Sequence, residues 1–162
     1  MDKRLLIFFF IISIVFSFLC SIWEAVLLSI PTSHVEMKFK EGGTVGVLLK
    51  SFKQNIDRPL AAILTLNTLA HTIGAMGVGA QAAVVYSDRA IDVAGFHLSF
   101  EALIAGGMTM AILFLSEIIP KTIGANSWKR LTNFTVLSLR VIIILLYPLV
   151  WVSQWITKLL KK

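Results

Sequence analysis

The chain is short, basic and strongly apolar. Its 162 residues are 57% hydrophobic and 15% charged, with a formal net charge of +6, and its mean hydropathy is +0.83. This composition is typical of a membrane protein, and it leaves no room for a separate soluble catalytic domain or for a soluble fold that presents basic residues to a nucleic acid. The single cysteine, Cys20, excludes a disulfide framework within this chain and a zinc cluster of the cysteine type.

Three apolar stretches are long enough to cross a bilayer, which takes about 20 mostly apolar residues. They are 5–30, 60–86 and about 100–119. The first resembles a secretory signal, but bulky Phe18 and Leu19 lie where a cleavage site needs small residues, so we expect it to be retained. The predicted fold class is all-α integral membrane, with three transmembrane helices plus juxtamembrane belt helices in a single domain over 1–162.

Most of the loop charge lies in segment 31–58. Gly42-Gly43 divides this segment, which predicts a pair of short interfacial helices. The segment holds five lysines and arginines, whereas loop 87–97 holds Arg89 beside two aspartates. The positive-inside rule therefore predicts that 31–58 is cytoplasmic and that the N-terminus is outside.

A fourth apolar stretch, 131–157, contains Arg140 and Pro148 and is followed by lysines. A crossing would export this basic tail against the positive-inside rule. We therefore expect a belt helix along the inner leaflet, or a partly re-entrant helix, with Arg140 reaching the headgroups and the C-terminus in the cytoplasm. The sequence leaves open whether this stretch crosses.

Polar residues recur on single helix faces within the spans. Ser17, Ser21 and Glu24 share one face of the first span, and Asn67 and His71 share one face of the second. Each also has a structural interpretation. Serines in a span commonly bond carbonyls of their own helix, and Asn67 can form a hydrogen bond between two helices. His71 can be a packing residue, and Glu24 can pair with a lysine near the helix end. Three glycines then predict close helix packing: Gly74, Gly77 and Gly79.

The strongest functional candidate is Glu117, near the end of the third span. An ionisable group at membrane depth is destabilising by several kcal/mol unless another group pairs with it, so such residues are commonly functional. Pro120 lacks the amide hydrogen that would bond the carbonyl of Ser116, so this carbonyl is predicted to be free beside the carboxylate. Hydroxyl, amide, carbonyl and carboxylate oxygens from three helices suit a small hard cation such as Mg²⁺ or Na⁺. The predicted metal-site residues are Ser21, Asn67, His71, Ser116 and Glu117.

Three ordered motifs resemble the transmembrane domain of the CNNM/CorC family, a domain long catalogued as domain of unknown function 21. Glu117-Ile118-Ile119-Pro120-Lys121 is similar to its Glu-x-x-Pro-Lys signature. The run from Ser21 to Ser29 is similar to its first-span Ser-x-Ser-Glu-Thr-Ala-Leu pattern, and the run from Leu64 to His71 is similar to its second-span Asn-x-x-x-Asn pattern. Glu41-Gly42-Gly43 matches the glycine-marked turn of its cytoplasmic linker.

The resemblance implies a homodimer in the cell membrane that carries Mg²⁺ out of the cytosol, with an inward Na⁺ gradient proposed as the drive. It places Ser21, Asn67 and Glu117 where the ion-contacting residues of the family lie. Trp23 replaces the second serine of the pattern, which shrinks or seals the cavity, and His71 replaces the second asparagine. A nitrogen donor weakens the case for Mg²⁺ against Mn²⁺, Co²⁺ or Zn²⁺.

Two functions of different class follow. In the first, the chain transports divalent cations; in the second, it is a non-transporting membrane subunit or scaffold for a partner. The second is suggested because the chain ends at Lys162 without the CBS pair and C-terminal domain of larger members, so that a partner would carry these cytoplasmic domains. An enzyme is not expected, because no nucleophile has a neighbouring base. No cofactor is expected besides the transported ion, and the expected partners are the bilayer and a second copy, with no nucleic acid.

Overall fold

The computed structural model describes residues 3–86, 90–93 and 96–160. Helices form almost all of it: α1 (Lys3–Ser29), α2 (Thr32–Glu41), α3 (Gly43–Gln54), α4 (Asp57–Tyr86), α5 (Phe100–Leu113), the π-helical turn η1 (Phe114–Ile118), α6 (Ile119–Asn126), α7 (Trp128–Leu145) and α8 (Tyr147–Leu160). Strands β1 (Ala90–Val93) and β2 (Phe96–Ser99) pair antiparallel, with Ala90 opposite Ser99. The protein is an all-α membrane protein with one small hairpin.

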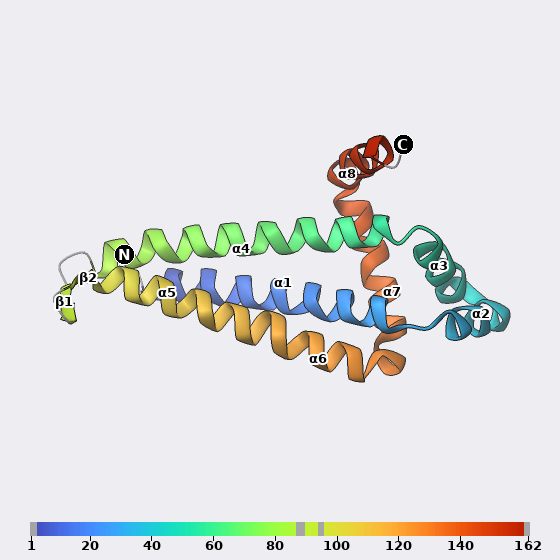
Figure 1. Ribbon diagram of the computed structural model, residues 1–162, viewed down its shortest axis with the longest axis horizontal. Coiled ribbons are helices and arrows are strands. Elements are labelled where there is room, and N and C mark those ends of the chain that lie inside the picture. The colour runs from blue at the N-terminus through green and yellow to red at the C-terminus, as the bar shows by residue number, and fades with distance from the viewer. Residues whose placement is uncertain (1–2, 87–89, 94–95, 161–162) are drawn as a thin grey trace.

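Three long rods lie side by side, formed by α1, α4 and the succession α5–η1–α6 (Figure 1). Within the described residues, Arg4–Ser29 and Asp57–Ala80 are each long and apolar enough to cross a membrane. The predicted third span, 100–119, is not one regular α-helix, because α5 has 14 residues and gives way to the π-helical turn. The backbone stays helical through both joins, so the rod continues to Asn126.

The apolar core lies at the end of the bundle where α1 and α4 meet α7 and the α2–α3 pair. Val26, Leu27 and Leu139 are fully buried there, and Trp23 is 4% exposed. Towards the N-terminal half of α1, large apolar side chains such as Phe8 and Ile11 face outward instead. An apolar exterior on a long helix is the pattern expected for a lipid-facing surface.

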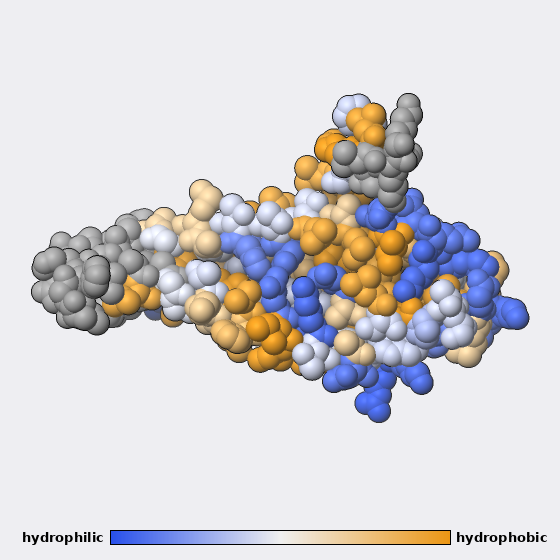
Figure 2. Space-filling view, viewed as in Figure 1, coloured by the Kyte–Doolittle hydropathy of each residue, from blue (hydrophilic) through white to orange (hydrophobic). Residues whose placement is uncertain are grey.

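The predicted pair of short helices in 31–58 is confirmed as α2 and α3. The turn between them is made by Gly42 and Gly43, whose φ angles of 80° and 87° lie in the left-handed region that favours glycine. Lys50 ties the two helices together, because its Nζ lies 3.1 Å from Glu36 Oε1 and 4.0 Å from the ring centroid of Phe39. Hydrophilic residues gather at this end of the molecule (Figure 2).

The single belt or re-entrant helix predicted over 131–157 is instead two helices, α7 and α8, which meet at an angle of 88°. The break falls at Leu146, where φ is −96° and ψ is 17°. Pro148 explains it, since its ring cannot follow Ile144 through a regular helix and it lacks an amide hydrogen for the Ile144 carbonyl. α7 crosses the end of the three rods, and α8 lies at the far end of α7, where it contacts α4 (Figure 1).

The prediction of a loop over 87–97 is corrected in part, because β1 and β2 occupy 90–93 and 96–99. β-branched and aromatic residues in this stretch, such as Ile91, Val93 and Phe96, favour strands. The charge comparison that rested on Arg89 concerns a residue outside the described part of the chain. The predicted sidedness of the loop therefore stays a prediction.

Candidate cation-binding site

A hydrogen bond from Ser13 joins α1 to α4. The Ser13 hydroxyl donates a 3.0 Å hydrogen bond to the carbonyl oxygen of Ala70. A Cβ atom on Gly74 would clash with the Ser13 side chain, and one on Gly77 would clash with the Phe9 ring. Close packing is thus confirmed at these two glycines, and the pairs show that α1 and α4 run antiparallel. Gly79 is different, since no atom of the described residues would lie within 4 Å of a Cβ atom at this position.

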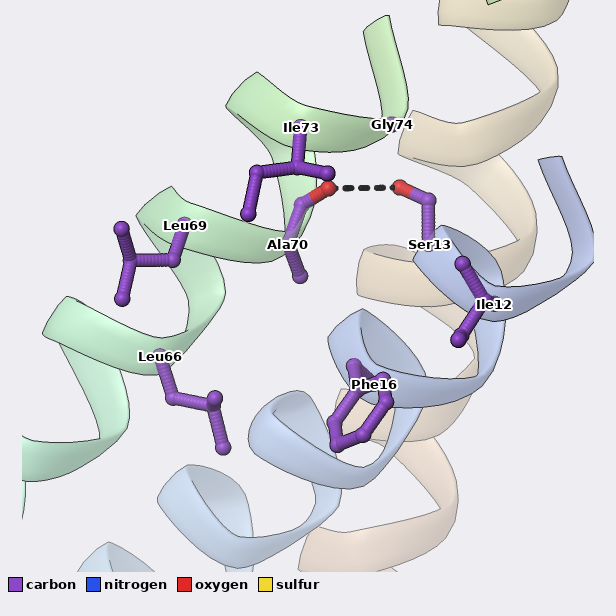
Figure 3. A pocket seen from close by; sticks show the side chains of 8 residues that line it. All are labelled: Ile12, Ser13, Phe16, Leu66, Leu69, Ala70, Ile73 and Gly74. Carbon is purple, nitrogen blue, oxygen red and sulfur yellow. Dashed lines mark hydrogen bonds between the residues drawn. The ribbon is translucent and has the colours of Figure 1, made fainter. Parts of the chain in front are cut away.

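A groove beside this contact is shown in Figure 3. Its volume is about 240 Å³, and its polar group is the Ser13 hydroxyl, which the Ala70 carbonyl already occupies. The other lining side chains are apolar: Ile12, Phe16, Leu66, Leu69 and Ile73 among them. The groove offers no free ligand to a cation, so the candidate site lies elsewhere.

Ser17, one turn after Ser13, joins all three rods. Its Oγ lies 2.6 Å from His71 Nε2 on α4 and 2.9 Å from Ser116 Oγ on η1. Ser116 Oγ also lies 2.5 Å from the carbonyl oxygen of Ile112, one turn back. Ser17 and Ser116 are fully buried. This chain of hydrogen bonds fixes how the three rods pack at the middle of the bundle.

The rod of the third span changes its register at this contact. In η1, the amide of Ile119 bonds the carbonyl of Phe114, five residues back, and Pro120 follows at the start of α6. With α-helical bonds, which reach four residues back, Pro120 would leave the carbonyl of Ser116 without a donor. With π-helical bonds, which reach five residues back, it would leave the carbonyl of Leu115 without a donor. The free carbonyl of Ser116 stays a prediction. The irregular backbone next to Glu117 is observed.

α6 packs alongside α1 in the same direction. A Cβ atom on Gly124 would lie 2.9 Å from Ala25 Cβ, so this glycine permits the close approach. Lys121 Nζ lies 3.3 Å from Glu24 Oε2. Glu24 therefore has the lysine partner that its structural interpretation requires, and this lysine belongs to the Glu-x-x-Pro-Lys motif.

Two of the predicted ligands carry buried oxygen atoms with no hydrogen-bond partner among the described residues. They are Ser21 Oγ and Asn67 Oδ1, and Ser21 is 1% exposed. A buried polar atom without a partner is destabilising, and such an orphan in a native fold calls for a ligand or another explanation. Both atoms are neutral oxygen donors of the kind that hard cations accept.

The helix registers bring these oxygens to one level. Ser21 is one turn beyond Ser17 on α1, and Asn67 is one turn before His71 on the antiparallel α4, so both lie directly past the Ser17–His71 contact. Pro120 is one turn beyond Ser116 on the parallel third rod. Ser21, Asn67 and Pro120 are therefore expected near one level of the bundle, and Glu117 lies between this level and that of Ser17.

Glu117 is the acidic residue of the third rod beside this level. Its side chain is partly buried, and within the described residues its carboxylate makes no hydrogen bond or ion pair, in contrast to that of Glu24. In the described part of the chain, no three His, Cys, Asp or Glu side chains come together. The candidate site is therefore a set of oxygen donors with one carboxylate.

His71 is placed differently from the other predicted ligands. Its Nε2 is engaged by Ser17, and the ring borders a cavity of about 160 Å³ between α4 and α5. The packing interpretation of His71 therefore has a specific partner, and its role as a ligand stays a prediction. Sequence reasoning set Ser17 aside as structural and overlooked Ser13; the signal was the unbroken spacing of four that links Ser13, Ser17 and Ser21.

Comparison with known proteins identifies the family of the chain. The model of the cyclin M transmembrane N-terminal domain matches residues 6–162, nearly the whole chain. The chain belongs to the cyclin M transmembrane domain family. It is also 26% identical over 139 residues to the UPF0053 protein sll1254 of Synechocystis sp., a match that covers 86% of this chain. The chain spans 37% of that relative's length.

Membership of this family indicates the general function of the domain. The cyclin M domain is a membrane transport domain, and its family is associated with divalent-cation transport. The motif residues Ser21, Asn67 and Glu117 belong to the metal site predicted from the sequence, together with His71 and Ser116. That metal site stays a prediction.

Proposed function

We propose that this cyclin M domain transports divalent cations across the cell membrane, with Mg²⁺ exported from the cytosol as the first expectation. The observation that carries the proposal is the pair of buried oxygens, Ser21 Oγ and Asn67 Oδ1, that have no hydrogen-bond partner among the described residues. Mg²⁺ accepts hard oxygen ligands and keeps several of its waters, so a site with one carboxylate and two neutral oxygens suits it. Mn²⁺, Co²⁺ and Zn²⁺ are the alternative ions if His71 turns from Ser17 to the metal.

In this proposal, Glu117 balances part of the ion's charge, while Ser21 and Asn67 replace water. The π-helical turn keeps backbone carbonyls out of the regular helical bonding pattern beside the ion, which is a recurrent property of broken helices at transport sites. Ser17 acts as a positioning residue, since it holds α4 and η1 at a fixed distance from α1. Export of Mg²⁺ against its gradient needs a coupling ion, for which we propose Na⁺.

The proposed assembly is a homodimer with the N-terminus outside and the α2–α3 pair in the cytoplasm. The basic composition of α2 and α3 supports this sidedness through the positive-inside rule. Gly79, Gly106 and Gly107 have open space at their Cβ positions, and small residues of this kind allow two helices of different subunits to approach closely.

Ion flux in liposomes tests the proposal. We expect Glu117→Gln to abolish Mg²⁺ flux, because the substitution removes the charge and keeps the shape, while the exposed Glu41→Gln leaves flux unchanged. The assay compares both variants with the wild type for Mg²⁺, Mn²⁺, Co²⁺ and Zn²⁺, with and without a Na⁺ gradient.

A folded wild-type protein that moves none of these ions would reject transport by this chain alone. The result would favour the second function, a membrane subunit that works with a partner. Flux that persists unchanged in Glu117→Gln would reject the site instead, and would leave transport itself standing.

A further inference from the structure

A lysine lies beside the candidate cation site. Lys121 follows Pro120 in the first turn of α6, and its Nζ lies 3.3 Å from Glu24 Oε2 on α1. The pair is partly open, since 44% of the Lys121 side chain and 26% of the Glu24 side chain are exposed. An ammonium on a flexible four-carbon stem can change its partner when it is not enclosed. Burial therefore does not fix Lys121 to Glu24.

A second carboxylate lies on the same strip of the third rod as Lys121. Ser116, Pro120 and Gly124, spaced by four residues, form the buried seam of this rod towards α1. Glu117 and Lys121 each follow a residue of the seam, and both are partly buried. The φ and ψ angles stay helical through the join between them. Side chains four residues apart on a helix are close enough to pair, and a glutamate before a lysine is the favourable order.

The carboxylate of Glu117 needs a positive charge whether or not an ion is bound. Among the described residues it makes no ion pair or hydrogen bond. An unpaired charge at membrane depth is destabilising by several kcal/mol. A bound cation would balance it, but a transporter that alternates access must also pass through a state with an empty site. Lys121, one turn along the same helix, is placed to supply the charge in that state.

We propose that Lys121 is a tethered counter-ion that exchanges between Glu24 and Glu117. When a cation occupies the site, Glu117 binds the cation and Lys121 pairs with Glu24, the pairing seen in the structure. When the cation leaves, the ammonium turns to Glu117 and balances its charge. Glu24 and Lys121 are thus positioning residues that set cation affinity without touching the ion. The inference rests on the proposed function, in which Glu117 binds the transported cation.

Mg²⁺ binding to the purified full chain in detergent, followed by isothermal titration calorimetry, tests the exchange. Glu24→Gln releases Lys121 to Glu117, so we expect it to weaken Mg²⁺ binding roughly fivefold, at the lower end of energetic couplings between two sites. Lys121→Met removes the competing charge at similar side-chain length, so we expect it to strengthen Mg²⁺ binding. The double variant should bind as Lys121→Met does, because Glu24 acts through the lysine.

The matched control is a second ion pair between a lysine and a glutamate, outside the site. Lys38 Nζ lies 2.7 Å from Glu41 Oε2 on α2, and both side chains are partly exposed. Lys38→Met and Glu41→Gln change the net charge by the same amounts as the two test variants. Both should leave Mg²⁺ binding unchanged.

A second measurement needs no ion. In the Glu24→Gln background and in the presence of a chelator, Lys121 has Glu117 as its remaining acidic partner in the proposed exchange. We expect Lys121→Met to lower the unfolding temperature of this background. The same substitution should have no such effect once Glu117→Gln is added, because the pair is then already broken.

Each alternative gives a different result. Equal weakening of Mg²⁺ binding by Glu24→Gln and Lys121→Met would make their ion pair a brace between α1 and α6, and would overturn the exchange. Wild-type binding in the double variant would also overturn it, since two charges that act only through their fields at the site would cancel.

The ion-free measurement separates this inference from the proposed function. An equal loss of unfolding temperature with and without the Glu117 carboxylate would exclude its pairing with Lys121. A wild type that binds no Mg²⁺ would reject the cation site of the proposed function instead. The ion-free comparison would then still confirm or reject the pairing of Lys121 with Glu117.

Discussion

Ser17 is a single small residue on which the packing of three helices depends. Its hydroxyl lies within hydrogen-bond distance of His71 on α4 and Ser116 on η1; the two serines are fully buried and His71 is partly buried. Serines in membrane helices commonly bond only their own backbone. Ser116 has such a bond to Ile112, whereas the two bonds of Ser17 both join other helices. A mutation at Ser17 is therefore expected to act between helices.

We predict that Ser17→Ala lowers the free energy of unfolding by about 1–2 kcal/mol, because it removes two interhelical hydrogen bonds and leaves His71 Nε2 without a partner. Thermal unfolding in detergent measures the change. Ser13→Ala is the control and should cost less, since it removes one bond, to the Ala70 carbonyl. Equal losses at the two positions would contradict the central role of Ser17.

The second prediction at this scale concerns Asn67, whose Oδ1 has no hydrogen-bond partner in the described part of the chain. Replacing it by leucine removes an unsatisfied buried oxygen at similar volume, so Asn67→Leu is expected to raise stability without cations by about 1 kcal/mol. The same variant should lose the stabilisation that Mg²⁺ gives the wild type. Unfolding temperatures with Mg²⁺ and with a chelator measure both effects.

The control for this experiment is Thr68→Val, at an exposed position of the same helix, which should change neither effect. If Asn67→Leu were less stable than the wild type without cations, the role of Asn67 would be to join helices rather than to bind an ion. That outcome would favour the structural interpretation that the sequence also allowed.

At the scale of elements, α1 is the helix against which the others pack. α4 approaches it through Gly74 and Gly77, and α6 approaches it through Gly124. In lipid, the hydrophobic effect does not drive helices together, so close backbone contact and interhelical hydrogen bonds carry the association. In this bundle, the glycines permit the close backbone contact and the serines form the interhelical hydrogen bonds.

The glycines allow a matched test of this packing. Gly74→Val is expected to destabilise the protein by about 1–3 kcal/mol, because a side chain there overlaps with Ser13. Gly79→Val should have little effect on the folded monomer, since the space at Gly79 is open. Thermal unfolding of both variants in detergent provides the comparison. A similar loss at both positions would point to helix propensity rather than packing as the cause.

At the scale of the whole molecule, the two ends of the bundle differ. One end carries the β1–β2 hairpin, and the other carries the apolar core, the α2–α3 pair and the crossing helix α7 (Figure 1). The basic residues of α2, α3 and the start of α7 lie at the second end. A membrane around the three rods would therefore meet an asymmetric protein with one positively charged side.

Cysteine labelling in intact cells tests this arrangement. In a Cys20→Ser background, single cysteines at Lys40 and Leu159, both exposed, are predicted to react with a membrane-impermeant maleimide only after permeabilisation. This result places α2 and the end of α8 on the cytoplasmic side, as the positive-inside rule requires. Reaction of the Leu159 position in intact cells would show instead that the α7–α8 pair crosses the membrane.

Much of the fold follows from local patterns. The α2–α3 pair and its glycine turn are where the sequence predicts them, and the first two spans end within a few residues of their predicted limits. Pro148 was visible in the sequence, but the 88° angle between α7 and α8 depends on what each helix packs against. The π-helical turn could not be predicted either. Pro120 removes one helical hydrogen bond in both an α-helical and a π-helical arrangement, and only the packing of η1 on α1 selects between them.

The sequence by itself determined that this is a helical membrane domain with a carboxylate next to a proline in its third rod, because hydrophobic length, charge bias and motif spacing are local properties of the chain. Only the tertiary structure decided which polar atoms have partners. Ser17 bonds His71 and Ser116, and Lys121 pairs with Glu24. Among the described residues, the buried oxygens of Ser21 and Asn67 have no partner. Those pairings depend on the relative registers of three helices, which close packing sets and no single segment encodes.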